Sequence, residues 1–343
     1  MQDSILIGIM VDYLHPLNIE RFISLDGGQV MIFKQGVNID KKLIPGLLLQ
    51  GNKWTKSYLP LPDVVYNQCY SEQRPFINKL EQKIGKRKVF NYVTAFDKWE
   101  IHKVLLKGGL GKFLPRTYRY ERHDIITLLH KEKKLILKPR KGNQGKNIFL
   151  FQQSYLRELQ LFEYSFKANL TFATVEKFKK YMDEKIVKHG PYLMQQKINI
   201  VKLNNQIFDL RILLQKDETG KWRITGDLSR LAVKDFFITN VCSEIYRAED
   251  IMEMARIKPQ NLIDDLHQLS LFAAKLLEDH FYMLGEICVD FALDEEGNLW
   301  IIEVNGKPDK NLFFYLKDEQ LLKRLYSAPF KYAYFLARNN KFS

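Results

Sequence analysis

Two apolar segments near the end of the chain carry carboxylates at a spacing that suits a metal ion. Residues 287–293 and 299–305 flank an Asp/Glu/Gly turn, a pattern that predicts a β-hairpin. Side chains alternate along a strand, so a loop of four residues, 295–298, would place Asp290 directly opposite Glu303. Their Cβ atoms would then lie about 5 Å apart.

Two like charges that face each other repel, and a divalent cation reverses the sign of that interaction. Mg²⁺ prefers oxygen ligands, and Asn305 adds a neutral oxygen one pleat beyond Glu303. The alternation also places Ile302 on the opposite face. The D-x(12)-E-x-N spacing therefore predicts a metal site at Asp290, Glu303 and Asn305. The plainer alternative is an exposed hairpin face whose carboxylates are solvated.

A glycine loop between two predicted strands could hold phosphates. Lys138 ends the first strand, and Gly142 and Gly145 follow in the sequence KPRKGNQGK. A lysine beside glycines can surround phosphates with a cation and bare backbone N–H groups. The loop lacks the GxxxxGK[ST] pattern of a Walker A motif. An ordinary Lys/Gly turn is the alternative.

Two arginines lie close to this chemistry. Arg211 follows Asp209 on one predicted strand, and Arg230 follows the next strand. Guanidinium groups beside a carboxylate hairpin suit a carboxylate or a transferring phosphoryl group. A simple salt bridge between Asp209 and Arg211 is an equally good interpretation of that pair.

The composition is that of a globular protein with anionic partners. The 343 residues suggest two or three domains at roughly 150 residues each. With 46% hydrophobic and 27% charged residues, the chain is neither disordered nor a coiled coil. A net charge of +13 favours nucleotides, nucleic acid, phosphorylated or carboxylate partners. No apolar run approaches the roughly 18 residues of a membrane span. Three scattered cysteines favour the cytoplasm.

The elements that must position these residues fall into three sections. Residues 1 to about 90 predict a small α/β unit, with strands at 5–11, 30–33, 47–51 and 63–67 and a helix from Pro75. The middle section predicts helices at 98–106, 124–133 and 174–188 and strands at 114–118, 135–151 (around the glycine loop) and 192–200. The last section predicts strands at 207–215, 222–228, 287–293 and 299–305, a helix at 259–280 and one or two helices from Asp318.

Taken in order, these blocks resemble the ATP-grasp superfamily, and within it the YheC/YheD-type proteins of spore-forming bacteria. The segments FDKWEIHKVL, ILKPRKGNQGKNI, YLMQQKINI, FDLRILLQKDETGKWRITG and EICVDFALDEEGNLWIIEVNGKPD all look like blocks of that family. The resemblance covers about residues 90 to 310. The segment Thr239–Glu244 lacks glycines that the family usually carries, a departure that concerns the substrate pocket.

The resemblance implies roles for individual residues. Arg211, Arg230 and Lys138 would be catalytic, meeting the γ-phosphate and the acyl substrate. Asp290, Glu303 and Asn305 would hold Mg²⁺. The remaining residues would bind ATP, through its phosphates or along the hinge that holds adenine: Lys98, Lys138, Gly142, Gln144, Gly145, Gln195, Gln196 and Ile198.

The resemblance also implies a fold and an activity. We expect an ATP-grasp fold of α/β and α+β type, with an N-terminal domain over 1–90 and ATP-grasp subdomains over 91–195 and 196–343. The implied activity is an ADP-forming carboxylate–amine ligase that uses ATP, Mg²⁺ and an acylphosphate. The amine acceptor would be an amino acid, a peptide or a carrier protein, with no membrane or nucleic-acid partner. The expected location is the cytoplasm, with spore association open. A coat-associated interaction protein with little turnover and an ATP-grasp kinase are the alternatives.

Overall fold

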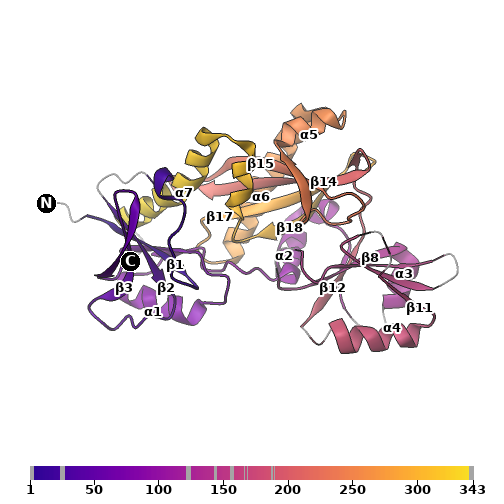
Figure 1. The fold of residues 1–343 in the computed structure, drawn as a ribbon, viewed down its shortest axis with the longest axis horizontal. Helices are drawn as coiled ribbons and strands as arrows, with labels where there is room; N and C mark the ends of the chain where they lie inside the picture. Colours follow the sequence, from indigo (N-terminus) through magenta and orange to yellow (C-terminus); the bar gives the residue numbers. More distant parts are fainter. Residues whose placement is uncertain are drawn as a thin grey trace.

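The structure is a computed structural model that describes residues 4–23, 28–120, 125–142, 145–154, 158–165, 167, 169–186, 188 and 190–339. Three β-sheets follow one another along the chain. Figure 1 places the first sheet at one end of the molecule, the second at the other end and the third between them. Within the described residues, no helix has both the length and the apolar character needed to cross a membrane.

The first sheet has the order β4-β3-β2-β1-β5-β6. Strand β1 pairs in parallel with β2 and β5, whereas β3 and β4 continue the sheet antiparallel. Alternation along β1 sends its side chains to two cores. One lies under helix α1, and the other lies under the second half of helix α7. The elements are β1 (Leu6–Val11), η1 (Glu20–Phe22), β2 (Gln29–Lys34), β3 (Ile44–Gln50), β4 (Lys53–Leu59), β5 (Val64–Asn67), α1 (Arg74–Ile84), β6 (Val89–Phe90) and α7 (Glu319–Arg338).

The second sheet is antiparallel throughout, in the order β11-β10-β9-β8-β12-β7. Leu135 and Leu137 of β8 face a core closed by helices α3 and α4. The period of two turns Lys138 to the opposite face, toward the third sheet. The elements are β7 (Thr117–Arg119), α3 (Ile125–Glu132), β8 (Lys134–Pro139), β9 (Phe149–Gln153), β10 (Leu159–Glu163), β11 (Leu170–Phe172), α4 (Val175–Tyr181), the π-helical turn η4 (Met182–Ile186) and β12 (Tyr192–Gln196).

The third sheet has the order β16-β15-β14-β17-β18, and β13 also pairs with β14. Helices α2, α5 and α6 cover one face, and η6 with the first half of α7 covers the other. The elements are α2 (Lys98–Leu105), η2 (Leu106–Leu110), η3 (Gly111–Phe113), β13 (Lys202–Leu203), β14 (Gln206–Lys216), β15 (Trp222–Ala232), β16 (Cys242–Tyr246), α5 (Ala248–Met254), α6 (Pro259–His280), β17 (Glu286–Leu293), β18 (Leu299–Asn305) and η6 (Lys310–Leu316).

The main sequence-predicted strands and helices are present, with two kinds of difference. The strand predicted over 192–200 ends at Gln196, and the single helix α7 accounts for the C-terminal segment. The predicted start of helix 124–133 lies outside the described residues, and α3 is described from Ile125. The strands and α-helices that sequence patterns missed are β4, β6, β10, β11, β13, β16 and α5.

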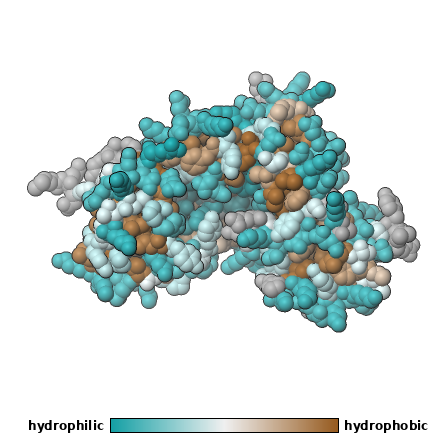
Figure 2. Space-filling model, viewed as in Figure 1, coloured by the Kyte–Doolittle hydropathy of each residue, from teal (hydrophilic) through white to brown (hydrophobic). Residues whose placement is uncertain are grey.

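The first and third sheets are joined by a shared helix and a buried carboxylate. The first half of α7 packs on the third sheet and its second half packs on the first, with Pro329 inside the helix between them. Figure 1 shows α7, in yellow, passing between the two sheets, and Figure 2 shows a notch that separates the first-sheet part from the second-sheet part. The first and third sheets are therefore tied together by α7 and Glu286. The second sheet meets the third-sheet part through a smaller apolar cluster of Leu150, Phe162, Phe237 and Ile238.

Glu286 of β17 is the polar centre of this junction and is 1% exposed. The Lys310 ammonium donates to its Oε2 at 2.9 Å, and the hydroxyl of Tyr66 on β5 donates to Oε1. Gln215 and Gln68 each donate at 2.9 Å. Burial acts to raise the pKa of Glu286, but the Lys310 charge and these hydrogen bonds outweigh it, so the pKa is lowered.

We expect Lys310→Met to destabilise the protein by about 3 kcal/mol or more at neutral pH, because it leaves a buried carboxylate without its cation. The lowered pKa means that the stability contributed by Glu286 is present above its ordinary pKa of 4.5 and is lost as the pH falls through the lower folded value. The variant's deficit should therefore shrink in acid. Urea unfolding at several pH values measures this, with the exposed helix residue Lys323→Met as control. A deficit below 1 kcal/mol would show that the pair contributes little.

Candidate functional site

Four neighbouring strands of the third sheet place charged residues in two adjacent cross-strand rows. In one row Asp209 of β14 pairs with Arg230 of β15, and in the other Arg211 of β14 pairs with Asp290 of β17. Asp290 in turn lies opposite Glu303 of β18, as the hairpin spacing predicts. The third sheet therefore gathers two arginines and three carboxylates on one face, where they can interact across the strands.

The hairpin register that brings Asp290 opposite Glu303 differs from the register that a four-residue loop predicts. Leu293 pairs with Leu299, and the register then shifts between Asp290 and Phe291. The extra residue on β18 is Ile302, which turns to the same cavities as Glu303. The prediction that Ile302 faces the opposite side is therefore wrong, because a β-bulge breaks the alternation there.

Asp290 is held by both arginines. Arg211 donates Nε to Oδ1 at 2.7 Å and Nη2 to Oδ2 at 2.8 Å, and Arg230 Nη2 donates to Oδ2 at 2.9 Å. Asp290 is 1% exposed. Burial acts to raise its pKa, but the two guanidinium charges outweigh this and lower it. Arg211 thus pairs with Asp290, whereas Asp209 pairs with Arg230, so the salt bridge suggested between Asp209 and Arg211 gives way to these two pairs.

Glu303 takes its cation from helix α2. Asp97 caps that helix by accepting from the backbone N–H of Trp99 at 2.9 Å, and it also binds the Arg140 guanidinium. The cap fixes Lys98 at the first helical position, where its Nζ lies 3.2 Å from Glu303 Oε1. The same ammonium donates to the Gly142 carbonyl at 2.9 Å. The repulsion expected between Asp290 and Glu303 is therefore already balanced by side-chain cations.

Lys138 reaches the same place from the second sheet. Its ammonium donates to Gln195 Oε1 at 2.8 Å and to the Ile302 carbonyl at 3.3 Å. The Gln195 amide donates to the Thr117 hydroxyl at 2.9 Å, which fixes the orientation of its oxygen. Burial, partly offset by the Glu303 charge, lowers the pKa of Lys138 to about 8.

Glu303 lines four cavities, and three of them are large enough to matter here. An apolar one, here the hinge cavity, lies between the second and third sheets. A second, the glycine-loop cavity, has a volume of 420 Å³, and a third, the arginine cavity, has a volume of 280 Å³. The hinge cavity is lined by Gln196, Lys197, Ile198, Ile136, Ile148, Phe237, Ile238 and Ala292. The glycine-loop cavity is lined by Lys98, Lys141, Gly142, Asn305 and Lys307, and the arginine cavity by Arg211, Arg230, Cys242, Asn305 and Lys307.

The predicted site residues thus gather around one carboxylate. The nucleotide and metal roles given to them remain predictions. Gly145 has a positive φ of 70° and packs against Asn240, where a Cβ would approach within 2.9 Å, so the glycine loop touches the third-sheet part. Gln144 lies outside the described residues. Among the described residues, no cluster of three His, Cys, Asp or Glu side chains could hold a metal ion.

Sequence reasoning missed Lys307. This lysine borders both the glycine-loop cavity and the arginine cavity, two residues after Asn305. Its place in the run EVNGKPD, directly after the carboxylate strand, was the available signal. The missed bulge at Ile302 carried no signal, because its sequence is that of a regular strand.

A lysine from one antiparallel sheet and a lysine from a helix meet a carboxylate of a second antiparallel sheet beside an apolar cavity, an arrangement typical of the ATP-grasp class. The chain belongs to the YheC/D-like ATP-grasp family, which matches residues 86–336. This confirms the family resemblance seen in the sequence. Two relatives come from Bacillus subtilis (strain 168). The endospore coat-associated protein YheD is 26% identical over 91% of this chain and 71% of its own length. The endospore coat-associated protein YheC is 25% identical over 82% and 80%.

Solved structures share the fold at lower sequence identity. D-alanyl-alanine synthetase A from Vibrio cholerae O1 biovar eltor str. N16961 has a TM-score of 0.59 at 12% identity, covering 99% of this chain and 100% of that one. N5-carboxyaminoimidazole synthetase from Staphylococcus aureus, complexed with ADP, also has a TM-score of 0.59 at 11% identity, covering 96% and 78%. The predicted ATP-grasp fold is therefore confirmed.

The buried Lys138 should make the stability of this protein depend on pH in a recognisable way. Its pKa falls from 10.5 to about 8 in the folded state, so burying the charged form costs about 3 kcal/mol below pH 8. That cost disappears as the pH rises from 8 toward 10.5. The free energy of unfolding of Lys138→Met, compared with that of wild type, should therefore be highest near pH 7. This advantage should be lost by pH 10.5.

Chemical denaturation of both proteins across this range isolates the effect, because all other titrations are shared. The substitution also removes the hydrogen bonds to Gln195 and Ile302. Their loss changes the difference in unfolding free energy by the same amount at every pH, so it does not alter the pH dependence of that difference. The exposed Lys112→Met serves as control and should give a flat difference. A flat difference in Lys138→Met as well would contradict the depressed pKa.

Proposed function

We propose that the protein is an ATP-dependent carboxylate–amine ligase that forms ADP. The observation that carries this proposal is the meeting of Lys98, Lys138 and Glu303 where an apolar cavity opens into two polar ones. The group formed by Asp209, Arg230, Arg211 and Asp290 is neutral as a whole. Among the other described charged residues that line the three cavities, lysines outnumber carboxylates, so the site favours an anion. The lysines are Lys98, Lys138, Lys141, Lys197 and Lys307, and the carboxylates are Glu72, Glu303 and Asp309.

In this proposal the hinge cavity holds adenine between the two sheets. Gln195, Gln196, Lys197 and Ile198 border this cavity, and the isoleucines and Phe237 supply apolar faces. Gln195 also orients Lys138: its Oε1 accepts from the ammonium, and its amide donates to the Thr117 hydroxyl. Lys138 and Lys98 would then meet the phosphates beside the glycine loop.

The same geometry suggests how Mg²⁺ could be held. Glu303 and Asn305 both border the glycine-loop and arginine cavities, so their oxygens face the proposed phosphate positions. Asp290 Oδ2 accepts two hydrogen bonds and Oδ1 accepts one, which leaves one lone pair of Oδ1 for an ion. The three oxygen donors fit the preference of Mg²⁺. When bound, the ion would neutralise charge on the transferring phosphoryl group.

The proposed reaction has two steps. A carboxylate oxygen of the substrate attacks the γ-phosphorus of ATP, the bond to the bridging oxygen breaks, and ADP leaves with that electron pair. An amine then attacks the carbonyl carbon of the acylphosphate, phosphate leaves, and the amine loses a proton. Arg211 and Arg230, held rigid by Asp290 and Asp209, would face the developing charge from the arginine cavity.

One alternative has a specific observation in its favour. The two Bacillus relatives are described as endospore coat-associated proteins, a description that fits an interaction role as well as an enzymatic one. In that case the fold would bind nucleotide without turnover. ADP release that depends on an added carboxylate and an added amine distinguishes the ligase from this alternative and from a kinase.

We expect millimolar MgATP to raise the melting temperature of the wild-type protein. A ligand that binds only the folded state stabilises it by mass action, by about 2.7 kcal/mol at one hundred times its Kd. Lys138→Ala should lose most of this increase, whereas Lys56→Ala, an exposed lysine on β4, should keep it. An equal increase in both variants would remove Lys138 from the nucleotide site.

Glu303→Gln should separate catalysis from folding. The amide keeps the shape and can still accept from Lys98, so the melting temperature without ligand should change little. Loss of the charge should lower Mg²⁺-dependent ADP release by at least about 100-fold. ADP release measured across a Mg²⁺ series tests this, with the exposed Glu295→Gln in the hairpin turn as the matched control. Normal turnover in Glu303→Gln would refute the metal assignment.

A further inference from the structure

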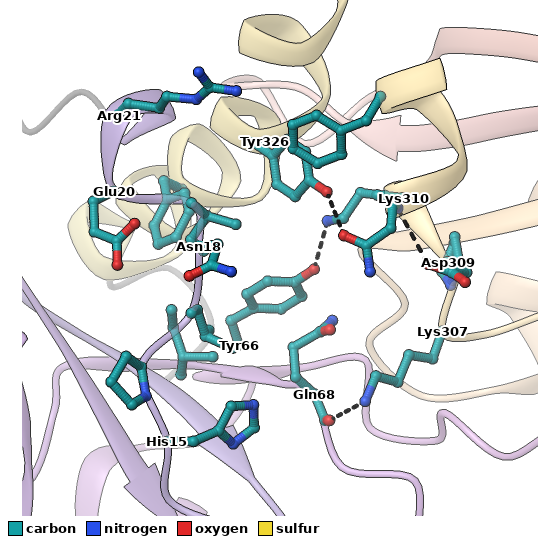
Figure 3. A pocket seen from close by; sticks show the side chains of 18 of the residues that line it. His15, Asn18, Glu20, Arg21, Tyr66, Gln68, Lys307, Asp309, Lys310 and Tyr326 are labelled. Atoms are coloured by element: carbon teal, nitrogen blue, oxygen red, sulfur yellow. Dashed lines mark hydrogen bonds between the residues drawn. The ribbon is translucent and has the colours of Figure 1, made fainter. Parts of the chain in front are cut away.

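A cavity larger than the glycine-loop and arginine cavities, here the large cavity, lies away from the hinge, between the first sheet and the segment that follows β18. It has a volume of 820 Å³. Figure 3 shows its walls: the loop after β1 with His15 and Asn18, Tyr66 and Gln68 at the end of β5, and Lys307 to Lys310. Cavities of about 300–1,000 Å³ hold drug-sized ligands, so this one exceeds the needs of a single amino acid.

This large cavity adjoins the proposed reaction centre. Tyr70, Lys307 and Asp309 line both the large cavity and the arginine cavity, where Arg211 and Glu303 lie. Lys307 donates to the Gln68 carbonyl at 2.6 Å, and its Nζ lies 3.4 Å from the centroid of the Tyr70 ring. An extended ligand in the large cavity could therefore pass this pair and place one end at the arginines.

The charges of the large cavity differ between its two sides. Lys307 stands at the end nearest the reaction centre, and burial lowers its pKa to about 8. Glu20 lies on the opposite side in Figure 3, and its carboxylate has no hydrogen bond or ion pair with another described residue. Two other cations of the lining already have carboxylates: Lys310 pairs with Glu286 at 2.9 Å, and Arg21 lies 3.6 Å from Glu319.

The remaining lining suits a peptide. Aromatic rings from β5, η6 and α7 offer faces for apolar side chains, whereas carboxamides at the rim can both donate to and accept from peptide groups. The carboxamide of Asn18 points into the cavity in Figure 3. The aromatic residues are Tyr66, Phe314, Tyr326 and Phe330, and the carboxamides are Asn18 and Asn311.

We propose that the large cavity binds a short zwitterionic peptide as the acid substrate, with its C-terminal carboxylate at Lys307 and its N-terminal ammonium at Glu20. Lys307 is the cation at this end of the cavity, whereas Arg211 and Arg230 beyond it are already paired with Asp290 and Asp209. The assignment of this peptide as the acid substrate rests on the proposed ligase function. The occupancy of the cavity by a peptide does not.

Calorimetric titration of the full-length protein without nucleotide tests the occupancy. The probes are the tetrapeptide Ala-Phe-Ala-Ala with free ends, its C-terminal amide, its N-acetyl form, and free alanine. We expect the free tetrapeptide to bind best, the two blocked forms to bind about tenfold more weakly because each loses a charge-assisted contact, and alanine to bind weakest. Equal binding of alanine and the tetrapeptide, or no binding of any probe, would overturn the proposal.

Two variants test the orientation. Lys307→Gln should remove the preference for the free acid over the amide and keep the preference for the free amine. Glu20→Gln should do the reverse. The exposed residues Lys56→Gln and Glu218→Gln serve as charge-matched controls and should keep both preferences. If both site variants kept the wild-type pattern, the proposed orientation would be wrong.

ADP release with the same probes separates this inference from the ligase proposal. Peptide binding without any carboxylate-dependent ADP release would leave the cavity assignment standing and contradict the ligase. ADP release driven by single amino acids, with no peptide binding, would support the ligase and overturn the cavity assignment.

Discussion

The buried Asp290 carboxylate, held between Arg211 and Arg230, is the constraint on which the site depends. A carboxylate at 1% exposure is costly unless it is paired, and three hydrogen bonds from two guanidinium groups supply that pairing. Arg230 binds both Asp290 and Asp209, so four charged residues on three strands hold one another in position. The arginine cavity thus has a rigid wall before any ligand enters.

The two proposed binding regions lie at junctions of different character. The large cavity lies where the first and third sheets share α7 and the buried Glu286–Lys310 pair, which tie its walls together. The hinge cavity lies between the second and third sheets, where Lys138 and Lys98 reach across to backbone carbonyls of Ile302 and Gly142. A nucleotide would therefore replace lysine contacts that cross between two sheets, whereas a peptide would enter a cavity whose walls are joined by a buried ion pair and a shared helix.

The sequence predicted the parts of this arrangement that follow from periodicity and motif order. Strand alternation placed Asp290 opposite Glu303, and the order of blocks indicated the ATP-grasp fold. Short strands such as β11 and β13 escaped notice, because two or three residues do not establish a period of two. The cations that neutralise each carboxylate could not be paired from sequence. Arg211 lies 79 residues from Asp290, and the choice between Asp209 and Asp290 as its partner depends on the register of three strands.

The β-bulge at Ile302 shows how a local departure from regular structure can serve the site. In a regular strand Ile302 would turn away from the face that carries Glu303. With the extra residue its side chain turns to the hinge cavity, and its carbonyl accepts from Lys138. One inserted residue therefore connects the apolar and the polar halves of the site. It also gives the buried ammonium of Lys138 a second partner besides Gln195, which helps to hold a cation where burial alone would favour its neutral form.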